Sequence, residues 1–403
     1  MMIKVAHITT VDLSLRLLLL NQMQAIRDAG YEVVGISTPG RYVADIERAG
    51  IRHIPVDMTR TFSPREDLVS LGSLVQVMRR EGFDIVHTHN PKPGLLGQLA
   101  ARLAGVPIVV NTLHGFYFHD GMGPFWRRFY ITTETVAAYC SDVILSQNPE
   151  DIETAIATGI AGPQKLRHLG NGIDLRRFNP DEVKESTLIR KRKALGIRAG
   201  QPVVGFVGRL VQEKGLLEFL AAARLVLDRV PLARFLIIGP ADEEKPDALT
   251  PSIAESFGIA GACIFTGMRD DMPDLYALMD VFVLPSHREG FPRSPMEASA
   301  MGVPCLVTDI RGCRETVEHG CNGWLMPVHN VNQLADAIAT LLRNPALAAH
   351  MGAEARRKAV AEFDERLVFA RVLDEYARLT KAKLAVSQTH ALPFSQSIET
   401  AEL

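Results

Sequence analysis

Short apolar runs rich in β-branched residues alternate with helical patterns along almost the whole chain of 403 residues. This alternation is typical of βαβ units, whose strands pair in parallel sheets. The predicted strands of a first sheet are residues 3–9, 32–37, 51–56, 84–88, 107–111 and 143–146. The pattern starts again at residues 203–207, and the chain is too long for one ordinary core. The sequence therefore predicts two doubly wound α/β domains.

A charged stretch at residues 181–198 separates the two patterns, so we place the domain boundary there. The expected domains are residues 1–180 and 181–360, followed by a helix at residues 364–381. Residues 384–403 have no periodicity, and we expect a disordered tail.

Composition excludes several classes of protein. Lys plus Arg number 44 and Asp plus Glu number 46, so no global charge favours a nucleic-acid partner. The 5 cysteines (Cys140, Cys263, Cys305, Cys313 and Cys321) form no CxxC pair and no metal cluster, which is typical of a reducing compartment. No signal peptide is visible, and the apolar run at residues 17–20 is too short to span a bilayer. We expect a cytoplasmic protein, or one that is peripheral on the inner face of the cytoplasmic membrane.

Two glutamates, Glu289 and Glu297, follow the predicted strand at residues 281–284 with seven residues between them. Ser294-Pro295-Met296-Glu297 fits a capping box, in which Glu297 only satisfies backbone amides. Glu289 precedes a Gly-Phe-Pro break and is not explained in this way. An acid in a loop between a strand and a helix start is how open α/β sheets build ligand sites. Both interpretations of Glu297 stay open at this point.

A glycine-rich loop follows the first strand of the second pattern: Gly205-Phe206-Val207-Gly208-Arg209-Leu210, then Lys214-Gly215. Glycine allows close approach of a ligand, and the two cations suit phosphate, although such cations are also common on solvated surfaces. The spacing is neither GxGxxG nor a Walker A loop, which disfavours dinucleotide and nucleoside-triphosphate binding of those kinds.

Histidines end two predicted strands of the first pattern. His87 and His89 point to one face, as zinc ligands would, but no third ligand is evident. His114 ends the next strand, at the sheet edge where ligands bind, and has either a structural or a functional role. Asp270-Asp271 is similar to an acidic metal pair, and a solvated loop or helix cap is the alternative.

Aromatic residues beside Arg127 and Arg128 form another ambiguous segment, residues 116–130. They fit either a helix packed into the core or an interfacial patch against anionic lipid.

Four motifs together resemble the retaining glycosyltransferases of family 4, which have the GT-B fold. They are the E-x7-E pair, the GRLVQEKG loop, Asn171-Gly172-Ile173-Asp174 and His114-Gly115-Phe116. The resemblance extends from residue 4 to about residue 381. It implies two Rossmann-like domains facing across a cleft, with the acceptor on the first domain and a nucleotide sugar on the second. It also implies that the helix at residues 364–381 packs back onto the first domain.

The resemblance also implies residue roles. Arg209 and Lys214, beside Gly208, would hold the donor diphosphate, and Glu297 would bind the ribose hydroxyls. Glu289, with the backbone of Gly290 and Phe291, would face the transferred sugar. Met268 and Arg269 would border the base, and His114 would reach toward the sugar or the scissile bond. The implied catalytic residues are Arg209, Lys214, Glu289 and His114.

The first-domain pattern (ITT, HTHNPKPG, NTLHGFYFHDGMGP) resembles bacterial transferases that build capsule, O-antigen or N-glycan precursors on polyprenyl diphosphate. Such enzymes commonly use UDP-linked N-acetylhexosamines, without a metal, a further cofactor or a protein nucleophile. One departure concerns the loop after the first strand, where many relatives carry Gly-Gly and this chain reads Thr9-Thr10-Val11-Asp12-Leu13-Ser14. The alternatives are a UDP-sugar 2-epimerase of the same fold and a nucleotide-sugar-binding protein without turnover. A dehydrogenase is disfavoured by the glycine spacing.

Overall fold

The computed structural model describes residues 2–89, 91–118, 121–242 and 245–389, with backbone alone at 384–389. The chain divides into two compact units: unit 1 takes Met1–Leu169 and the segment from Phe369 onward, and unit 2 takes Gly170–Val368. This division falls before the boundary at 180/181 that the sequence suggests. The reason is local packing, because Ile173 and Phe178 belong to the core of unit 2 and the Ile173 amide donates to Phe363 O at 2.8 Å.

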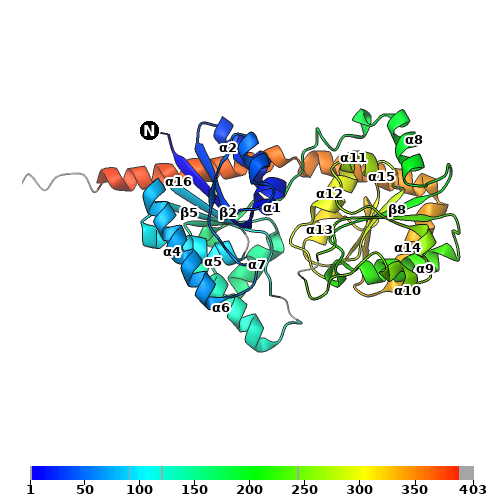
Figure 1. Cartoon of the computed structure of the whole chain (residues 1–403), viewed down its shortest axis with the longest axis horizontal. Coiled ribbons are helices and arrows are strands. Elements are labelled where there is room, and N and C mark those ends of the chain that lie inside the picture. Colours follow the sequence, from blue (N-terminus) through cyan, green and yellow to red (C-terminus); the bar gives the residue numbers. More distant parts are fainter. Residues whose placement is uncertain (1, 90, 119–120, 243–244, 390–403) are drawn as a thin grey trace, which may run out of the picture. The chain divides into compact units, whose positions relative to one another are not determined.

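Unit 1 is built on a seven-stranded sheet in the order β3-β2-β1-β4-β5-β6-β7. Two of its strands, β2 and β5, are labelled in Figure 1. All of its paired strands are parallel. The strands are β1 (Lys4–Val11), β2 (Glu32–Thr38), β3 (Arg52–Pro55), β4 (Ile85–His89), β5 (Ile108–Leu113), β6 (Val143–Ser146) and β7 (Leu166–His168). The helices are α1 (Asp12–Ser14), α2 (Leu20–Asp28), α3 (Val43–Arg48), α4 (Pro64–Glu81), α5 (Pro91–Ala104), α6 (Pro124–Cys140) and α7 (Pro149–Ala157), with a π-helical segment at Leu15–Leu19.

Unit 2 has a six-stranded parallel sheet in the order β10-β9-β8-β11-β12-β13. The strands are β8 (Val203–Val207), β9 (Arg234–Ile238), β10 (Cys263–Phe265), β11 (Val281–Leu284), β12 (Cys305–Thr308) and β13 (Gly323–Met326). The helices are α8 (Glu185–Ala194), α9 (Leu216–Leu227), α10 (Ile253–Ser256), α11 (Met272–Tyr276), α12 (Arg293–Ala300), α13 (Cys313–Thr316), α14 (Val331–Arg343) and α15 (Pro345–Glu362).

Both sheets confirm the doubly wound prediction. In each sheet the chain first forms the strands on one side of the starting strand and then crosses over to form the strands on its other side. The crossing points lie between β1 and β4 in unit 1, and between β8 and β11 in unit 2. At such a point the loops leave neighbouring strands in opposite directions, which opens a crevice at the carboxyl ends of the strands. The candidate site should therefore be sought beside β8 and β11.

The last helix, α16 (Glu365–Thr389), begins in unit 2 and passes into unit 1 at Phe369. Its Tyr376 is fully buried in unit 1 and lies 2.6 Å from Nδ1 of His87. The helix continues through Thr389, whereas the sequence predicts a disordered tail from residue 384. The rest of the predicted tail, residues 390–403, lies outside the described residues.

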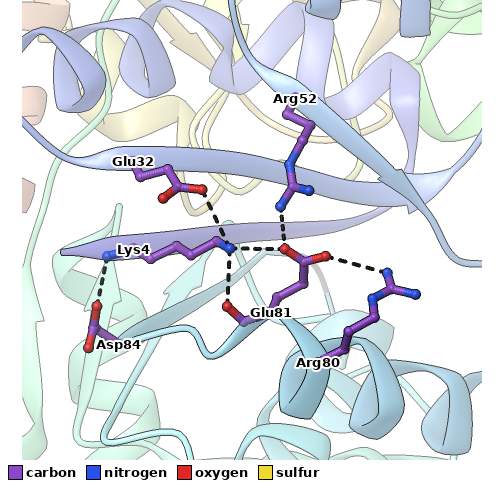
Figure 2. Close-up of polar contacts among 6 residues, drawn as sticks. All are labelled: Lys4, Glu32, Arg52, Arg80, Glu81 and Asp84. Carbon is purple, nitrogen blue, oxygen red and sulfur yellow. Dashed lines mark hydrogen bonds and ion pairs between the residues drawn. The ribbon is translucent and has the colours of Figure 1, made fainter. Parts of the chain in front are cut away.

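A cluster of ion pairs closes the opposite, amino edge of the unit 1 sheet (Figure 2). Lys4 Nζ contacts Glu81 Oε2 at 2.9 Å and Glu32 Oε1 at 3.4 Å, and Arg52 also pairs with Glu81. Hydrogen bonds from Arg52 and then Lys4 lower the pKa of Glu81 to about 2, so the carboxylate stays ionised at neutral pH. Asp84 accepts from the Lys4 amide at 2.8 Å. These ion pairs link the amino ends of the strands to the last residue of α4. They lie at the edge of the sheet opposite the carboxyl ends of the strands, where ligands bind.

Candidate active site

The glycine-rich loop after β8 contacts the end of β11 through Gly215. The backbone at Gly215 is left-handed, with φ 74°, and a Cβ there would overlap the Pro285 carbonyl oxygen. Only glycine fits this position without displacing the strand end. The approach brings Lys214 Nζ to 2.6 Å from Glu289 Oε1. The two residues that the sequence singled out in separate loops therefore form one ion pair.

Glu289 is held firmly on one side. Its side chain is 8% exposed, and Oε1 accepts both from Lys214 and from Ser286 Oγ at 2.7 Å. Ser286 is itself buried at the end of β11. Within the described parts of the chain no hydrogen-bond partner is found for Oε2. One oxygen is thus fixed by the protein, and the other is available to a ligand hydroxyl.

Arg209 lies one residue beyond Gly208, whose amide donates to Ile238 O at 2.9 Å and so continues the sheet pairing. Its guanidinium contacts Asp242 Oδ2 at 2.6 Å and remains partly exposed. A guanidinium has five N–H donors and an ammonium three, so both cations keep donors beyond their carboxylate partners. Arg209 and Lys214 are therefore suited to an anionic ligand at this sheet edge.

Glu297 does not close a capping box, so that interpretation is wrong. Helix α12 starts at Arg293 after Pro292, with no side-chain cap, which leaves Ser294 inside the first turn. Glu297 Oε2 instead accepts from the buried Tyr276 hydroxyl at 2.9 Å. Burial raises the pKa of Glu297, and Arg293 and the Tyr276 hydrogen bond oppose that shift. The second glutamate therefore also has one oxygen anchored to the protein.

Gly290 and Phe291 follow Glu289 in a tightly packed turn. A Cβ on Gly312, where φ is 80°, would overlap the Gly290 carbonyl oxygen. Phe291 O accepts from Asn171 Nδ2 at 2.9 Å, which ties the turn to the Asn-Gly-Ile-Asp segment. The loop that presents Glu289 is thereby fixed from both sides.

Met268 and Arg269 lie in the loop after β10. Met268 is exposed, and Arg269 makes two hydrogen bonds to Asp271, at 2.8 and 2.6 Å. Lys191 also pairs with Asp271, while the Asp270 carbonyl accepts from Arg177 at 2.7 Å. Asp271 is thus already occupied by cations, which supports the structural interpretation of the acidic pair over a metal site.

Buried histidines line the carboxyl edge of unit 1. His7 on β1 pairs in register with His87 on β4, so both side chains project on the same face of the sheet as His89. His7 Nδ1 lies 3.0 Å from His89 Nε2, and His89 Nδ1 lies 3.2 Å from His114 Nε2. His87 is held between Tyr376 and Thr112, at 2.6 and 2.7 Å. We call His7, His87, His89 and His114 the histidine chain.

Every ring in the histidine chain is neutral at pH 7. Burial lowers the pKa of His7 to about 3 and that of His114 to about 4, and it lowers those of His87 and His89 well below the usual value. His114 can therefore act as a hydrogen-bond partner but not as a cation. The sequence revealed three members of the chain and missed His7 and Tyr376, which only strand register and the return of α16 bring to this face.

A small pocket beside His114 contains a further carboxyl group. It is lined by Pro91, Gly94, Asn111, Thr112, Leu113, His114, Gly115 and Glu134. Burial, and then the Asp151 carboxylate, raise the pKa of Glu134 to about 7. Glu134 has no signature in the sequence, because it lies within α6, far from any strand end.

The loop that lacks Gly-Gly is built around Asp12. β1 extends to Val11, and the Asp12 side chain is buried and accepts from the Tyr42 amide at 2.7 Å. The Asp12 side chain thus lies in the loop where many relatives have Gly-Gly. Its hydrogen bond to the Tyr42 amide links this loop to the loop after β2.

The aromatic segment at the start of α6 is not core. Phe125 and Trp126 are 75% and 55% exposed, and the ring of Trp126 packs edge-on against Phe129, which contacts Phe62. Phe116 and Phe118 are buried, and the half-buried Tyr130 packs against the same core cluster, so these three residues follow the core interpretation. We call Phe62, Phe125, Trp126 and Phe129 the aromatic cluster. No described helix is both long and apolar enough to cross a membrane.

Comparison with known proteins agrees with this geometry. The family model described as glycosyl transferases group 1 matches residues 189–358, and that described as glycosyl transferase 4-like domain matches residues 18–172. A relative from Escherichia coli, UDP-Gal:alpha-D-GlcNAc-diphosphoundecaprenol alpha-1,3-galactosyltransferase, is 32% identical over 83% of this chain and 87% of its own. A relative from Campylobacter jejuni, N,N'-diacetylbacillosaminyl-diphospho-undecaprenol alpha-1,3-N-acetylgalactosaminyltransferase, is 28% identical over 89% of this chain and 94% of its own.

Solved structures give the same fold. The structure of Anabaena Alr3699/HepE in complex with UDP and glucose superposes with a TM-score of 0.78 at 21% identity, covering 93% of this chain and 99% of that one. Two doubly wound units of this kind are the GT-B fold of glycosyltransferases. The chain belongs to the group 1 glycosyltransferases, the family 4 group, and is a glycosyltransferase.

The histidine chain should make unit 1 sensitive to acid. A folded pKa below the unfolded value of about 6.5 means that the unfolded state binds more protons below that pH, so stability falls as pH falls. Each buried histidine should remove about 1.4 kcal/mol per pH unit between about 6.5 and its folded pKa. We expect hydrogen exchange of β1 and β4, corrected for intrinsic rates, to report a large loss of protection from pH 7.5 to 5.5. The loss should be smaller in His7→Gln, and an identical pH dependence in both proteins would contradict the assignment.

Proposed function

We propose that the protein transfers a sugar from a UDP-sugar to a polyprenyl-diphosphate-linked acceptor in bacterial surface polysaccharide synthesis, with retention of configuration. The observation that carries this proposal is the Lys214–Glu289 ion pair at the crossing point of unit 2, beside Arg209. The names of the two relatives support the substrate class, because one includes UDP-Gal and both include diphosphoundecaprenol acceptors. The Anabaena protein of the same fold, which binds UDP and glucose, supports a nucleotide-sugar donor.

In this proposal the donor diphosphate displaces water between Arg209 and Lys214. The free Oε2 of Glu289 accepts from a hydroxyl of the transferred sugar, and the backbone of Gly290 and Phe291 borders the same group. Glu297, held by Tyr276, binds the ribose hydroxyls with its other oxygen. Met268 is exposed in the loop after β10 and borders the base together with Arg269.

Breaking the sugar–phosphate bond leaves a diphosphate with growing negative charge. Fixed cations aimed at that charge lower the barrier because they need no reorganisation during the reaction. Lys214 is fixed by Glu289 and Arg209 by Asp242, so both meet this requirement. We propose that the phosphate oxygen takes the acceptor proton, so that Glu289 is not a nucleophile. The cations then supply the positive charge without a metal ion or further cofactor.

The acceptor belongs on unit 1 in this scheme. The neutral His114 would orient a hydroxyl group of the acceptor substrate by hydrogen bonding. The Glu134 carboxyl group lines the same pocket and could accept a hydrogen bond from that hydroxyl. For the donor sugar we propose an N-acetylhexosamine or a related hexose, since the two relatives are named as galactosyl- and N-acetylgalactosaminyltransferases.

A lipid-linked acceptor requires access to a membrane surface. Phe62, Phe125 and Trp126 of the aromatic cluster are exposed and Phe129 is half-buried, and the exposed Arg128 lies two residues after Trp126 on α6. Exposed aromatics beside basic side chains suit the interface of an anionic bilayer. We therefore propose a cytoplasmic location with peripheral contact through this cluster.

Arg209→Ala or Lys214→Ala should remove most transferase activity while the fold survives. A charged contact to the leaving diphosphate contributes roughly 2–4 kcal/mol in the transition state, or about 30- to 1000-fold in rate. The measurement is UDP release with a panel of UDP-sugars and lipid-diphosphate acceptors. Arg224→Ala is a matched control, because this arginine is on the surface of α9 and pairs only with Asp228 among the contacts of the described residues. Near-wild-type turnover in both site variants would contradict the diphosphate assignment.

The same assay separates the alternatives. A transferase releases UDP when an acceptor is present, whereas a 2-epimerase converts the donor without an acceptor, and a binding protein does neither. Turnover that persists in excess EDTA supports transfer without a metal, and turnover restored only by Mn²⁺ or Mg²⁺ contradicts it.

The aromatic cluster should control binding to vesicles. Phe125→Ser with Trp126→Ser removes apolar area worth about 25 cal/mol per Å² at the interface, so co-sedimentation with anionic vesicles should fall at least tenfold. Ile189→Ser with Leu232→Ser removes similarly exposed apolar side chains from unit 2 and serves as the control. Equal loss in the two double variants, or no loss in the first, would contradict a specific interface.

A further inference from the structure

Three metal-ligating side chains gather on unit 2 outside the residues assigned to the donor. Glu218 Oε1 lies 2.8 Å from His287 Nε2 and 2.7 Å from His329 Nδ1. The two imidazole rings lie 4.4 Å apart between centroids and are tilted edge to face. All three ligand atoms lie within 4.8 Å of one another. Nothing in the sequence brings them together, because they come from three different loops or helices.

The three elements that supply them meet at the carboxyl edge of the sheet. Glu218 is in the first turn of α9, directly after the Lys214–Gly215 turn. His287 follows β11, and its amide donates to Glu213 O at 2.9 Å. His329 precedes α14, which packs against α9. The side chains therefore cross-link two loops to one helix.

Two features of this cluster are unusual for a simple surface hydrogen-bond network. Glu218 Oε2 is buried and has no hydrogen-bond partner in the described part of the chain. His329 has a left-handed backbone, φ 63°, which is uncommon for a residue other than glycine. The carboxylate is therefore held by two imidazoles through Oε1, while Oε2 is left unsatisfied.

We propose that Glu218, His287 and His329 bind one divalent transition-metal ion of the zinc type. Two imidazole nitrogens and a carboxylate oxygen are a ligand set that selects such ions over Mg²⁺ and Ca²⁺, which prefer oxygen alone. The side chain of His329 is 65% exposed, so water can complete the coordination. The ion would fix the loop that leads from β11 toward Glu289. It would not contact the donor diphosphate.

Metal binding would bring the ligand atoms to tetrahedral spacing, and the two imidazole nitrogens now lie within 4.8 Å of each other. In a tetrahedral zinc site the ligand atoms are about 3.3 Å apart, so each imidazole would move about 0.5 Å away from Glu218. Each histidine here donates the proton of the nitrogen that would bind the metal. That proton moves to the other ring nitrogen through solvent, so the neutral rings become ligands without a net loss of charge. The free Oε2 of Glu218 gains a positive partner in the same step.

The histidine chain of unit 1 is a less suitable place for an ion, although His7, His87 and His89 also lie close together. Both ring nitrogens of each of these residues already have hydrogen-bond partners. The three ligands there include no carboxylate, so a buried divalent charge would be uncompensated. The cluster on unit 2 has the charge and the open positions that the chain in unit 1 lacks.

Titration of the untagged protein, freed of metal with EDTA and desalted, tests the proposal without any nucleotide sugar. We expect calorimetry with ZnCl₂ at pH 7.5 to give one site per chain, and Co²⁺ to give the visible absorption of a site with nitrogen ligands. Glu218→Gln, His287→Gln and His329→Asn should each weaken binding at least about tenfold. Asparagine also tolerates the left-handed backbone, so His329→Asn should keep the fold.

His350→Gln is the matched control, since His350 is exposed on α15 of the same unit. It should leave Zn²⁺ affinity unchanged. Absence of saturable binding, or affinities that are equal in the three cluster variants and the wild type, would overturn the proposal. Because no transfer reaction is measured, either result is independent of the glycosyltransferase assignment of individual donor residues.

Discussion

The ion pair between Lys214 and Glu289 joins the two loops that leave the sheet of unit 2 at its crossing point. It forms because the backbone at Gly215 can approach the end of β11 more closely than any side chain would allow. Without that approach the ammonium and the carboxylate would be two separate surface charges, each exposed to water and weakly placed. With it, each charge is fixed by the other while both keep hydrogen-bonding capacity for a ligand.

The same arrangement recurs around the site. Asp242 holds Arg209, and Tyr276 holds Glu297, in each case through part of the available hydrogen-bonding capacity. Such anchoring reduces the reorganisation needed when a substrate binds or when charge develops in the transition state. The carboxyl edge of the unit 1 sheet differs, because it is lined by neutral histidines that hydrogen-bond to one another. A charged edge that suits a diphosphate and a neutral edge that suits hydroxyl groups are compatible with the proposed division, in which unit 2 binds the donor and unit 1 the acceptor.

Local periodicity was sufficient to predict the two parallel sheets, because buried parallel strands are continuous apolar runs and the helices between them are long. The candidate residues at strand ends, such as Lys214, Glu289 and His114, could also be found, since the carboxyl edge of a parallel sheet collects ligand-binding loops. The hydrogen-bond partners of these residues could not be predicted from the sequence. The Ser294–Glu297 spacing fits a capping box, but the helix starts earlier, at Arg293. Tyr276, distant in sequence, donates its hydroxyl proton to Glu297 instead. His7, Tyr376 and Glu134 likewise depend on register and on helix packing, which have no signature in a single sequence.

The account depends most directly on the different tasks assigned to the two glutamates, which kinetics of Glu289→Gln and Glu297→Gln can separate. In the proposed mechanism Glu289 faces the sugar on which positive charge develops, so its loss should lower kcat with little change in donor KM. Glu297 is proposed to bind ribose equally in the ground and transition states, so its loss should raise donor KM and leave kcat nearly unchanged, while glutamine can still accept from Tyr276. Full kcat in Glu289→Gln, or an unchanged donor KM in Glu297→Gln, would contradict the account.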